Sequence, residues 1–574
     1  MHLLTYLKIF TTILIVTLFL FFTSAYISMK LGAMPWPIVF SIVVSAGLLR
    51  LFSRHVTRHE VNMAQAGGTI GGLMAAAVAF VLPGLYLQPS SPPAGGLPSV
   101  WLLSLLAGAG GLLGVLLSER VRSRYIEEAA LPYPAGQAGG ELIREGFDRG
   151  ALFSFVVLAG LLTGVFTLLR DQLDLYIIAV TLGSVLLPFM IAPMGVGAGY
   201  ILGVRTGINW LAGAVIGLAV LVPIGGLVVT RLSISEGITP ELWAQNIGMG
   251  LVLGSGLAQL IFHGQLRGLT DLVVKDDFRI PVLGLTVAGL ILLITAGVTW
   301  WGAVIALALA WILVPVAAQL TGTTNLDPLE QFGILAAFLV AGVYALFHLP
   351  LPEPAKYVIA FYVAVTTAVA GDIGHDFKSA QVVGTPNRYI VRADLFAVAV
   401  IIPAMPILIA IIRDTFVPEL FTANLPAPQA RIVFNTFSGL IHLPTFFGTI
   451  GAAFLLEGLR WYYKRRRVDQ PAEPLVLLIP MGIGIFLGWP LSFVIALGGI
   501  IRAWVDRSHP DWARAGVVLA AGIMGGEGIV GFITATLATT TPANLTTFRL
   551  VGAGVLLIAA IFILWHRRKN PRSP

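Results

Sequence analysis

The sequence contains no cysteine, and only 11% of its 574 residues are charged. The absence of cysteine excludes disulfide bonds, thiol catalysis, zinc ribbons and cysteine-ligated iron–sulfur clusters. The scarcity of charge argues against a soluble globular protein, in which roughly a quarter of the residues are charged. Hydrophobic residues make up 57% of the chain, and the mean hydropathy is +0.90. These features predict an all-α, polytopic membrane protein.

Sequence motifs typical of several enzyme classes are also absent. The chain has no GxxxxGK[ST] phosphate-binding loop, so we do not expect it to hydrolyse ATP. The HExxH and GxSxG motifs are missing too, which argues against hydrolysis by those routes. We therefore expect no enzyme activity and no cofactor.

What the chain does contain is a series of long apolar runs between residues 7 and 566. Because about 20 apolar residues cross a hydrocarbon core of about 30 Å, these runs predict about 16 spans. We divide them into an N-terminal half, residues 1–280, and a C-terminal half, residues 281–574. The predicted spans lie near residues 7–31, 34–52, 68–88, 99–118, 150–169, 175–203, 208–230, 246–264, 281–299, 301–320, 331–350, 356–370, 393–411, 436–459, 475–501, 515–538 and 547–566.

Lysine and arginine residues gather in alternate loops between these spans, for example at Arg122, Arg388 and Arg507. Basic loops face the cytoplasm, so we expect both termini there and the protein in the inner (plasma) membrane. The net charge of +7 then reflects topology and does not indicate nucleic-acid binding. The run from Leu475 to Ile501 has basic loops on both sides, so it must cross twice or enter and return. Its glycines and Pro490 allow such a break.

Two pairs of similar segments indicate an internal duplication. Pro193–Gly197 reads PMGVG, and Pro480–Gly484 reads PMGIG. Each is followed by an apolar segment and then an arginine. A second pair consists of amide residues that lead into apolar spans, namely Asn62 and Gln65 in one half and Asn325 and Gln331 in the other. Transporters are often built from such repeats, with the substrate site between the halves; chance similarity is the alternative.

Few charged residues lie inside the apolar runs, and each of these is a functional candidate because a charge is costly at membrane depth. Glu527 stands in a glycine-rich stretch and is a candidate proton carrier, or else a structural partner of a neighbouring helix. Lys30 ends the first run, where it would bind a carboxylate or extend its amine to the membrane surface.

The segment Leu131–Glu141 is too polar to span a membrane and too apolar for an ordinary loop. Its two prolines predict an extended entry, and the Gly/Ala run after them predicts a short helix that ends near Glu141. We interpret the segment as a re-entrant hairpin that lines a cavity, with Tyr133, Gln137 and Glu141 as candidate substrate contacts. An amphipathic surface loop is the alternative.

The segment Gly371–Lys378 clusters Asp372, His375, Asp376 and Lys378 after a span expected to end near Ala370. These residues predict a substrate or proton path. A metal site at i, i+3, i+4 spacing is a weaker alternative, because the neighbouring amine and amides are typical of a polar helix end.

Several segments in order resemble the oligopeptide transporter (OPT) family, including its yellow-stripe-like branch. The most specific are Leu131–Glu141, Gly371–Gly384 and Gly522–Gly531; the others are Tyr26–Gly32, Asn62–Pro83, Pro193–Gly203 and Pro480–Arg502. The resemblance implies a helical transporter of about 16 spans in two related halves, with uptake coupled to protons. It implies substrates that range from short peptides to metal chelates. The chain departs from the family pattern at Gln137–Gly140, which leaves the choice of substrate open.

Together these features predict a proton-coupled symporter whose partners are a small peptide or metal chelate, protons and membrane lipid, with no nucleic acid and no resident metal. Proton coupling is predicted for Glu527, Asp372 and Asp376. Substrate binding is predicted for Lys30, Asn62, Gln65, Tyr133, Gln137, Glu141, Asn325, Gln331 and Lys378. The alternatives are a membrane-embedded metal-dependent enzyme that acts on a lipid or prenyl substrate, and a passive channel.

Overall fold

The computed structural model describes residues 2–538, apart from residues 32–37, 54, 88–96, 147–150, 174, 176, 183–184, 232–237, 263–278, 325–326, 328, 350, 423–424, 426, 439–441 and 467–474. The span predicted near residues 547–566 therefore lies outside the described residues. Nearly all of the described chain is helical, which confirms the all-α prediction. The larger helices are α1 (His2–Leu31), α2 (Ile38–Phe52), α3 (Arg58–Tyr86), α4 (Val100–Arg122), α5 (Pro134–Gly146), α6 (Ala151–Gln172), α7 (Pro193–Leu202), α8 (Val204–Ile216), α9 (Val222–Arg231), α10 (Pro240–Phe262), α12 (Arg279–Thr295), α13 (Trp300–Thr324), α14 (Leu329–Leu346), α15 (Glu353–Val383), α16 (Asn387–Ile411), α17 (Pro428–Phe437), α18 (Leu443–Arg466), α19 (Leu478–Leu487), α20 (Trp489–Ser508) and α21 (Ala513–Ala538).

Shorter elements connect or extend these helices. They are the π-helical turns η1 (Ser123–Glu128), η2 (Gly217–Leu221) and η3 (Ile412–Phe416), the 3-10 turns η4 (Val417–Glu419) and η5 (Pro510–Trp512), and the antiparallel strands β1 (Ile177–Leu182) and β2 (Val185–Met190).

Eight helices of the described part are long and apolar enough to cross a membrane. They are Leu7–Lys30, Arg58–Tyr86, Val100–Glu128, Val204–Arg231, Trp300–Thr323, Glu353–Val383, Asn387–Phe416 and Trp489–Ser508. Shorter apolar helices, such as α7 and α19, accompany them. The chain is thus a multi-pass membrane protein.

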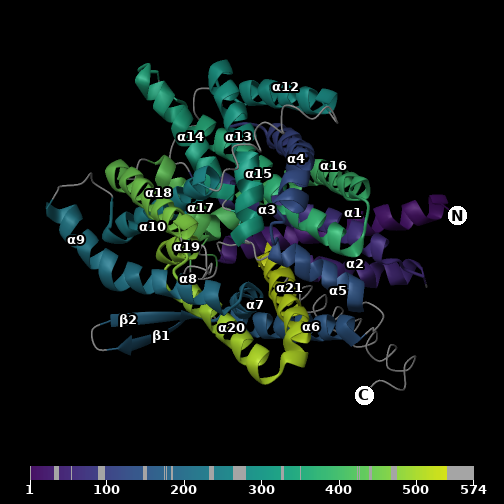
Figure 1. Ribbon diagram of the computed structural model, residues 1–574. Coiled ribbons are helices and arrows are strands. Elements are labelled where there is room, and N and C mark those ends of the chain that lie inside the picture. The colour runs from purple at the N-terminus through teal and green to yellow at the C-terminus, as the bar shows by residue number, and fades with distance from the viewer. Residues whose placement is uncertain are drawn as a thin grey trace.

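The helices form two packed groups that share a boundary. The first bundle contains α1–α5 and α12–α17, and the second contains α6–α10 and α18–α21. Helices α1 and α2 of the first bundle contact α21 of the second. In Figure 1, α15 and α3 lie side by side in the middle of the molecule, with α12–α14 on one side and α20 and α21 on the other. Each half of the sequence contributes helices to both bundles.

Helices α3 and α15 are the most deeply buried spans, and the apolar window of each is wholly enclosed by protein. Small residues make this enclosure possible because they let helix backbones approach closely. In α3, a Cβ added at Gly71 would meet the backbone of Thr17 in α1. In α4, a Cβ at Gly114 would meet the backbone carbonyl of Thr366 in α15. The centre of the first bundle is therefore a close-packed and lipid-free region.

The second bundle contains two broken helices. Gly203 separates α7 from α8, and Gly488 separates α19 from α20, with φ angles of 86° and 74°. Such positive φ angles favour glycine. The break predicted within residues 475–501 thus falls at Gly488.

The two broken helices pack against each other in a reciprocal pattern. Gly199 of α7 lies against Ile495 of α20, and Gly484 of α19 lies against Trp210 of α8. Gly213 and Met481 make a second such contact, which Gly498 and Val196 repeat. These contacts match each residue of α7–α8 with one of α19–α20 at a constant separation in the sequence. The matched residues are Gly199 and Gly484, Trp210 and Ile495, Gly213 and Gly498, and Val196 and Met481. The alignment of PMGVG with PMGIG in the sequence differs from this structural alignment by two residues.

Two span predictions were wrong. The run near residues 175–203 does not form one helix, because β1 and β2 form a hairpin before α7 begins at Pro193. Its β-branched residues favour strands, as in the segment IIAVTL of β1. The span expected over residues 356–370 is longer, since α15 continues to Val383. Asp372, His375 and Asp376 therefore lie inside a buried helix and do not follow its end.

Candidate functional site

A column of polar side chains runs along the contact between α3 and α15. Its members on α3 are Asn62, Gln65 and Thr69, which face α15 because they recur at helical spacing. Gln65 donates to the Oδ1 atom of Asp376 over 2.6 Å, and the Thr69 hydroxyl donates to its Oδ2 atom over 3.1 Å. The Ser379 hydroxyl donates to the Asn62 amide oxygen over 2.8 Å. These side chains are all buried. The structure thus brings together Asn62, Gln65 and Asp376, which the sequence placed far apart.

The predicted hairpin at Leu131–Glu141 forms the short helix α5 and the turn before it, and α5 continues past Glu141 to Gly146. Glycines on one face of α5 let it lie against α15, since a Cβ at Gly136 would meet the backbone of His375. The Gly136 backbone N–H also donates to His375 Nδ1 over 3.2 Å. Because Nδ1 accepts this bond, the imidazole is neutral. The predicted hairpin segment therefore packs against α15 at His375, the residue next to Asp376.

Tyr133 anchors this turn in the first bundle. Its hydroxyl donates to the Ala318 carbonyl over 2.6 Å, and its backbone N–H donates to the Gly322 carbonyl over 2.9 Å. Its ring meets the His375 ring edge-on, with centroids 5.3 Å apart. A Cβ at Gly374 would collide with the same ring. Tyr133, predicted as a substrate contact, thus joins α13 to α15.

Asp372 lies one turn before Asp376 on α15 and is fully buried. Neither of its carboxylate oxygens has a hydrogen-bond partner within the described parts of the chain. The residue interacts electrostatically with Asp376, Asp327 and Asp394, all of which are acidic. A polar group buried without a partner is costly, so Asp372 is the most strained member of the site. Across the residues that the structure describes, no three histidine or acidic side chains converge to hold a metal ion.

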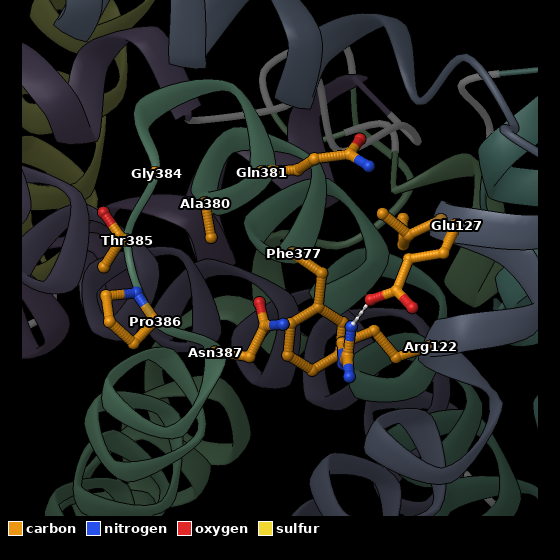
Figure 2. Close-up of a pocket in the computed structure, with 10 residues that line it drawn as sticks. Arg122, Glu127, Phe377, Ala380, Gln381, Gly384, Thr385, Pro386 and Asn387 are labelled. Atoms are coloured by element: carbon orange, nitrogen blue, oxygen red, sulfur yellow. Dashed lines mark hydrogen bonds and ion pairs between the residues drawn. The ribbon is translucent and has the colours of Figure 1, made fainter.

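A pocket of about 270 Å³ lies beside the C-terminal end of α15 (Figure 2). Its walls come from α4, η1, α15 and the start of α16, and they are formed by Arg122, Ile126, Glu127, Phe377, Ala380, Gln381, Gly384, Thr385, Pro386 and Asn387. Arg122 pairs with Glu127, and its guanidinium carbon lies 6.0 Å from the centroid of the Phe377 ring. The pocket therefore offers a cation, an anion, an aromatic ring and two amides.

The pocket and the polar column are connected through Thr385. Its hydroxyl lines the pocket and accepts a hydrogen bond from the Asn62 amide over 3.1 Å. His59 Nδ1 lies 3.0 Å from the same hydroxyl oxygen. A set of polar contacts thus leads from the pocket through Asn62 and Ser379 to the backbone carbonyl of Asp376.

Glu527 and Lys30 belong to a second charged cluster. Glu527 forms an ion pair with Arg170 of α6 and accepts the backbone N–H of Met194 over 2.8 Å at the start of α7. Arg170 also pairs with Asp171 over 2.6 Å. Lys30 is buried, donates to the Tyr26 hydroxyl over 3.3 Å and interacts electrostatically with Glu527. The cluster ties α1, α6, α7 and α21 together.

The remaining predicted residues lie within α5, next to the pocket, or outside the described residues. Glu141 accepts a hydrogen bond from Gln137 over 2.6 Å, within α5. Lys378 donates over 3.2 Å to Gln381, which lines the pocket. Asn325 and the side chain of Gln331 lie outside the described residues.

Several charged residues of these sites were missed in the sequence, among them Asp394, Arg170 and Arg122. Asp394 stands at the start of an apolar run and Arg170 at the end of one, so both resemble ordinary span ends. Arg122 was assigned only to a basic loop. The helices that face Asp394 and Arg170 are distant in the sequence, and no spacing indicates which helices meet.

Comparison of the sequence with known proteins shows to which family the chain belongs. A family model described as OPT oligopeptide transporter protein matches residues 4–275 and 278–538. A Haemophilus influenzae protein named "Putative oligopeptide transporter" is 28% identical over 209 residues. That match covers 34% of this chain and 32% of the relative, so it spans about a third of each protein. Because the family model covers nearly the whole chain, the predicted resemblance is confirmed, and the chain belongs to the OPT oligopeptide transporter family.

Proposed function

We propose that the chain is a proton-coupled symporter that carries short peptides or peptide-like metal chelates across the plasma membrane. The observation that carries this proposal is the polar column between α3 and α15. It joins a pocket to the buried residue Asp376, one turn from Asp372, through helices that lipid does not reach. Such a polar path inside a membrane protein marks a route for an ion or a substrate.

The chemistry of the pocket supports a zwitterionic substrate. Arg122 can attract a carboxylate and Glu127 an ammonium group once the substrate replaces their mutual ion pair. The amides of Gln381 and Asn387 match the hydrogen-bonding groups of a peptide bond. A volume of about 270 Å³ is slightly below the range of about 300–1,000 Å³ typical of ligand pockets, so a short peptide is favoured.

The buried acids support coupling to protons. An ionised carboxylate without partners is costly away from water, so gain or loss of a proton at Asp372 strongly changes the energy of the column. Asp376 interacts electrostatically with Asp372 and therefore responds to that change. Its backbone carbonyl is connected to the pocket through Ser379, Asn62 and Thr385. Proton binding and substrate binding can therefore influence each other. Glu527 stays a predicted carrier, but its pairing with Arg170 makes it the weaker candidate.

The arrangement of the chain supports the remaining parts of the proposal. The pocket contains Arg122 and adjoins Arg388, which the distribution of basic residues assigns to the cytoplasmic side together with both termini. The reciprocal contacts of α7–α8 with α19–α20 support two related halves at residues 1–280 and 281–574.

Uptake into proteoliposomes tests the proposal. We would compare radiolabelled trialanine with a labelled ferric chelate, each with and without an inward proton gradient. We expect the gradient to drive accumulation of one of them. The Asp376→Asn variant should lower that accumulation at least tenfold, because it removes the carboxylate that Gln65 and Thr69 hold.

The exposed Asp506→Asn variant on α20 is the matched control, and its uptake should equal that of the wild type. Equilibration of substrate without accumulation would reduce the protein to a passive facilitator. Absence of any flux for both compounds would contradict the proposal as a whole.

A further inference from the structure

Asp394 of α16 is a buried acid that the proposed function has not used. Its side chain is fully enclosed, and neither carboxylate oxygen has a hydrogen-bond partner among the described residues. A group in this state is rare in a folded protein and calls for an explanation. Its position in the bundle supplies one.

The packing of α16 places Asp394 beside α4, in a segment that also contacts α3. Ile402 and Val398 face Gly108 and Gly111 of α4, and Asp394 is the next residue on the same face of α16. It therefore faces the cytoplasmic end of α4. On the other side, the neighbouring carbonyl of Ala393 would lie 3.2 Å from a Cβ at Gly67 of α3.

Three acidic side chains interact electrostatically with Asp394. From α15 they are Asp376 and Asp372, and from α4 the group is Glu119. Arg120 is also buried on α4, but it does not hydrogen-bond to Asp394. Glu119 in turn pairs with Arg122 over 3.2 Å, and Arg122 pairs with Glu127 at the pocket.

We propose that Asp394 is the residue through which the transported proton leaves the buried site. Because no described group lies within hydrogen-bonding distance of Asp394, a water molecule that enters during the cycle connects the two acids. The O–H bond of protonated Asp376 breaks as an O–H bond forms on that water, and another O–H bond of the water breaks as one forms on Asp394. The proton then passes toward Glu119 and water at the pocket. Asp376 is left as the carboxylate that Gln65 and Thr69 stabilise by donating hydrogen bonds. This inference rests on the proposed proton-coupled transport.

The test separates proton release from substrate movement. Asp394→Asn protein is reconstituted, and two rates are measured with whichever of trialanine or the ferric chelate the wild type accumulates. One is uptake driven by a proton gradient. The other is exchange of labelled for unlabelled substrate at equal pH, which needs no net proton release. We expect gradient-driven uptake to fall at least tenfold while exchange stays within twofold of the wild type.

Further variants guard against a folding defect. Asp394→Glu keeps a carboxyl group and should recover at least a third of gradient-driven uptake, and Asp506→Asn should match the wild type in both rates. Unchanged uptake in Asp394→Asn would overturn the inference, and so would equal loss of uptake and exchange in folded protein. A wild type that exchanges substrate without responding to the gradient would instead refute the proposed coupling, and the inference would fall with it.

Discussion

Two kinds of environment are seen for buried acids among the residues that the structure describes, as Glu527 on the one hand and Asp372 and Asp394 on the other show. Glu527 has a full set of partners, namely Arg170 and the backbone N–H of Met194. Asp372 and Asp394 have no hydrogen-bond partner within the described structure. The first kind suits a structural contact between helices with a fixed geometry, because removing one partner of a buried pair is strongly destabilising. The second kind suits a group whose charge changes during a cycle.

The ion pair of Arg170 and Glu527 gives a prediction about stability. Arg170→Met leaves the carboxylate of Glu527 buried without its partner, which should cost about 3–5 kcal/mol. The double variant Arg170→Met, Glu527→Met removes both charges and should recover at least half of that loss. Unfolding in detergent, followed by the thermal midpoint, measures both effects.

The control for this prediction is Arg413→Met, which breaks the exposed pair of Arg413 and Asp414. An exposed pair contributes about 0–1 kcal/mol, so the thermal midpoint should hardly move. A double variant less stable than Arg170→Met alone would contradict the assignment of a structural pair.

At the scale of helices, the sequence predicted the fold class and a break within residues 475–501, because run length and glycine placement are local properties. It predicted the family from short motifs such as Leu131–Glu141. It placed the end of α15 too early. Polar residues such as Asp372 usually end a span, but here α3, α4 and α5 cover them. The hairpin β1–β2 was missed because a short apolar run does not distinguish a strand from a helix. The helices that surround Asp394 were unpredictable because packing between distant parts of the chain decides which helices meet.

The crossed helices α7–α8 and α19–α20 predict paired effects of substitution. Gly199→Val and Gly484→Val each introduce a side chain where the facing backbone carbonyl leaves no room. Since the two contacts are equivalent, we expect similar destabilisation, about 1–3 kcal/mol or more in each case. Thermal midpoints in detergent check this.

Gly226→Val in α9 is the control, because no atom lies within 4 Å of a Cβ at that position. Its thermal midpoint should stay near that of the wild type. A large loss for Gly199→Val alone would show that the two contacts are not equivalent.

At the scale of the whole molecule, the absence of cysteine makes the predicted topology directly testable. Single variants Glu353→Cys and Asp506→Cys place one thiol each at partly exposed positions, at the start of α15 and near the end of α20. We expect a membrane-impermeant maleimide to label Glu353→Cys in intact cells, and Asp506→Cys only after permeabilisation. The opposite pattern would reverse the proposed orientation.

Helices α3 and α15 have no surface in contact with the lipid of the membrane along their apolar windows. Their apolar windows are covered entirely by other helices, whereas only 22% of the window of Val204–Arg231 is buried. The acyl chains of the bilayer therefore touch the supporting helices and not those that carry the polar column. A cell that changes the length or saturation of its lipids as temperature changes would leave the surroundings of Asp376 as they were, so the chemistry of the site is insulated from the host's lipid composition.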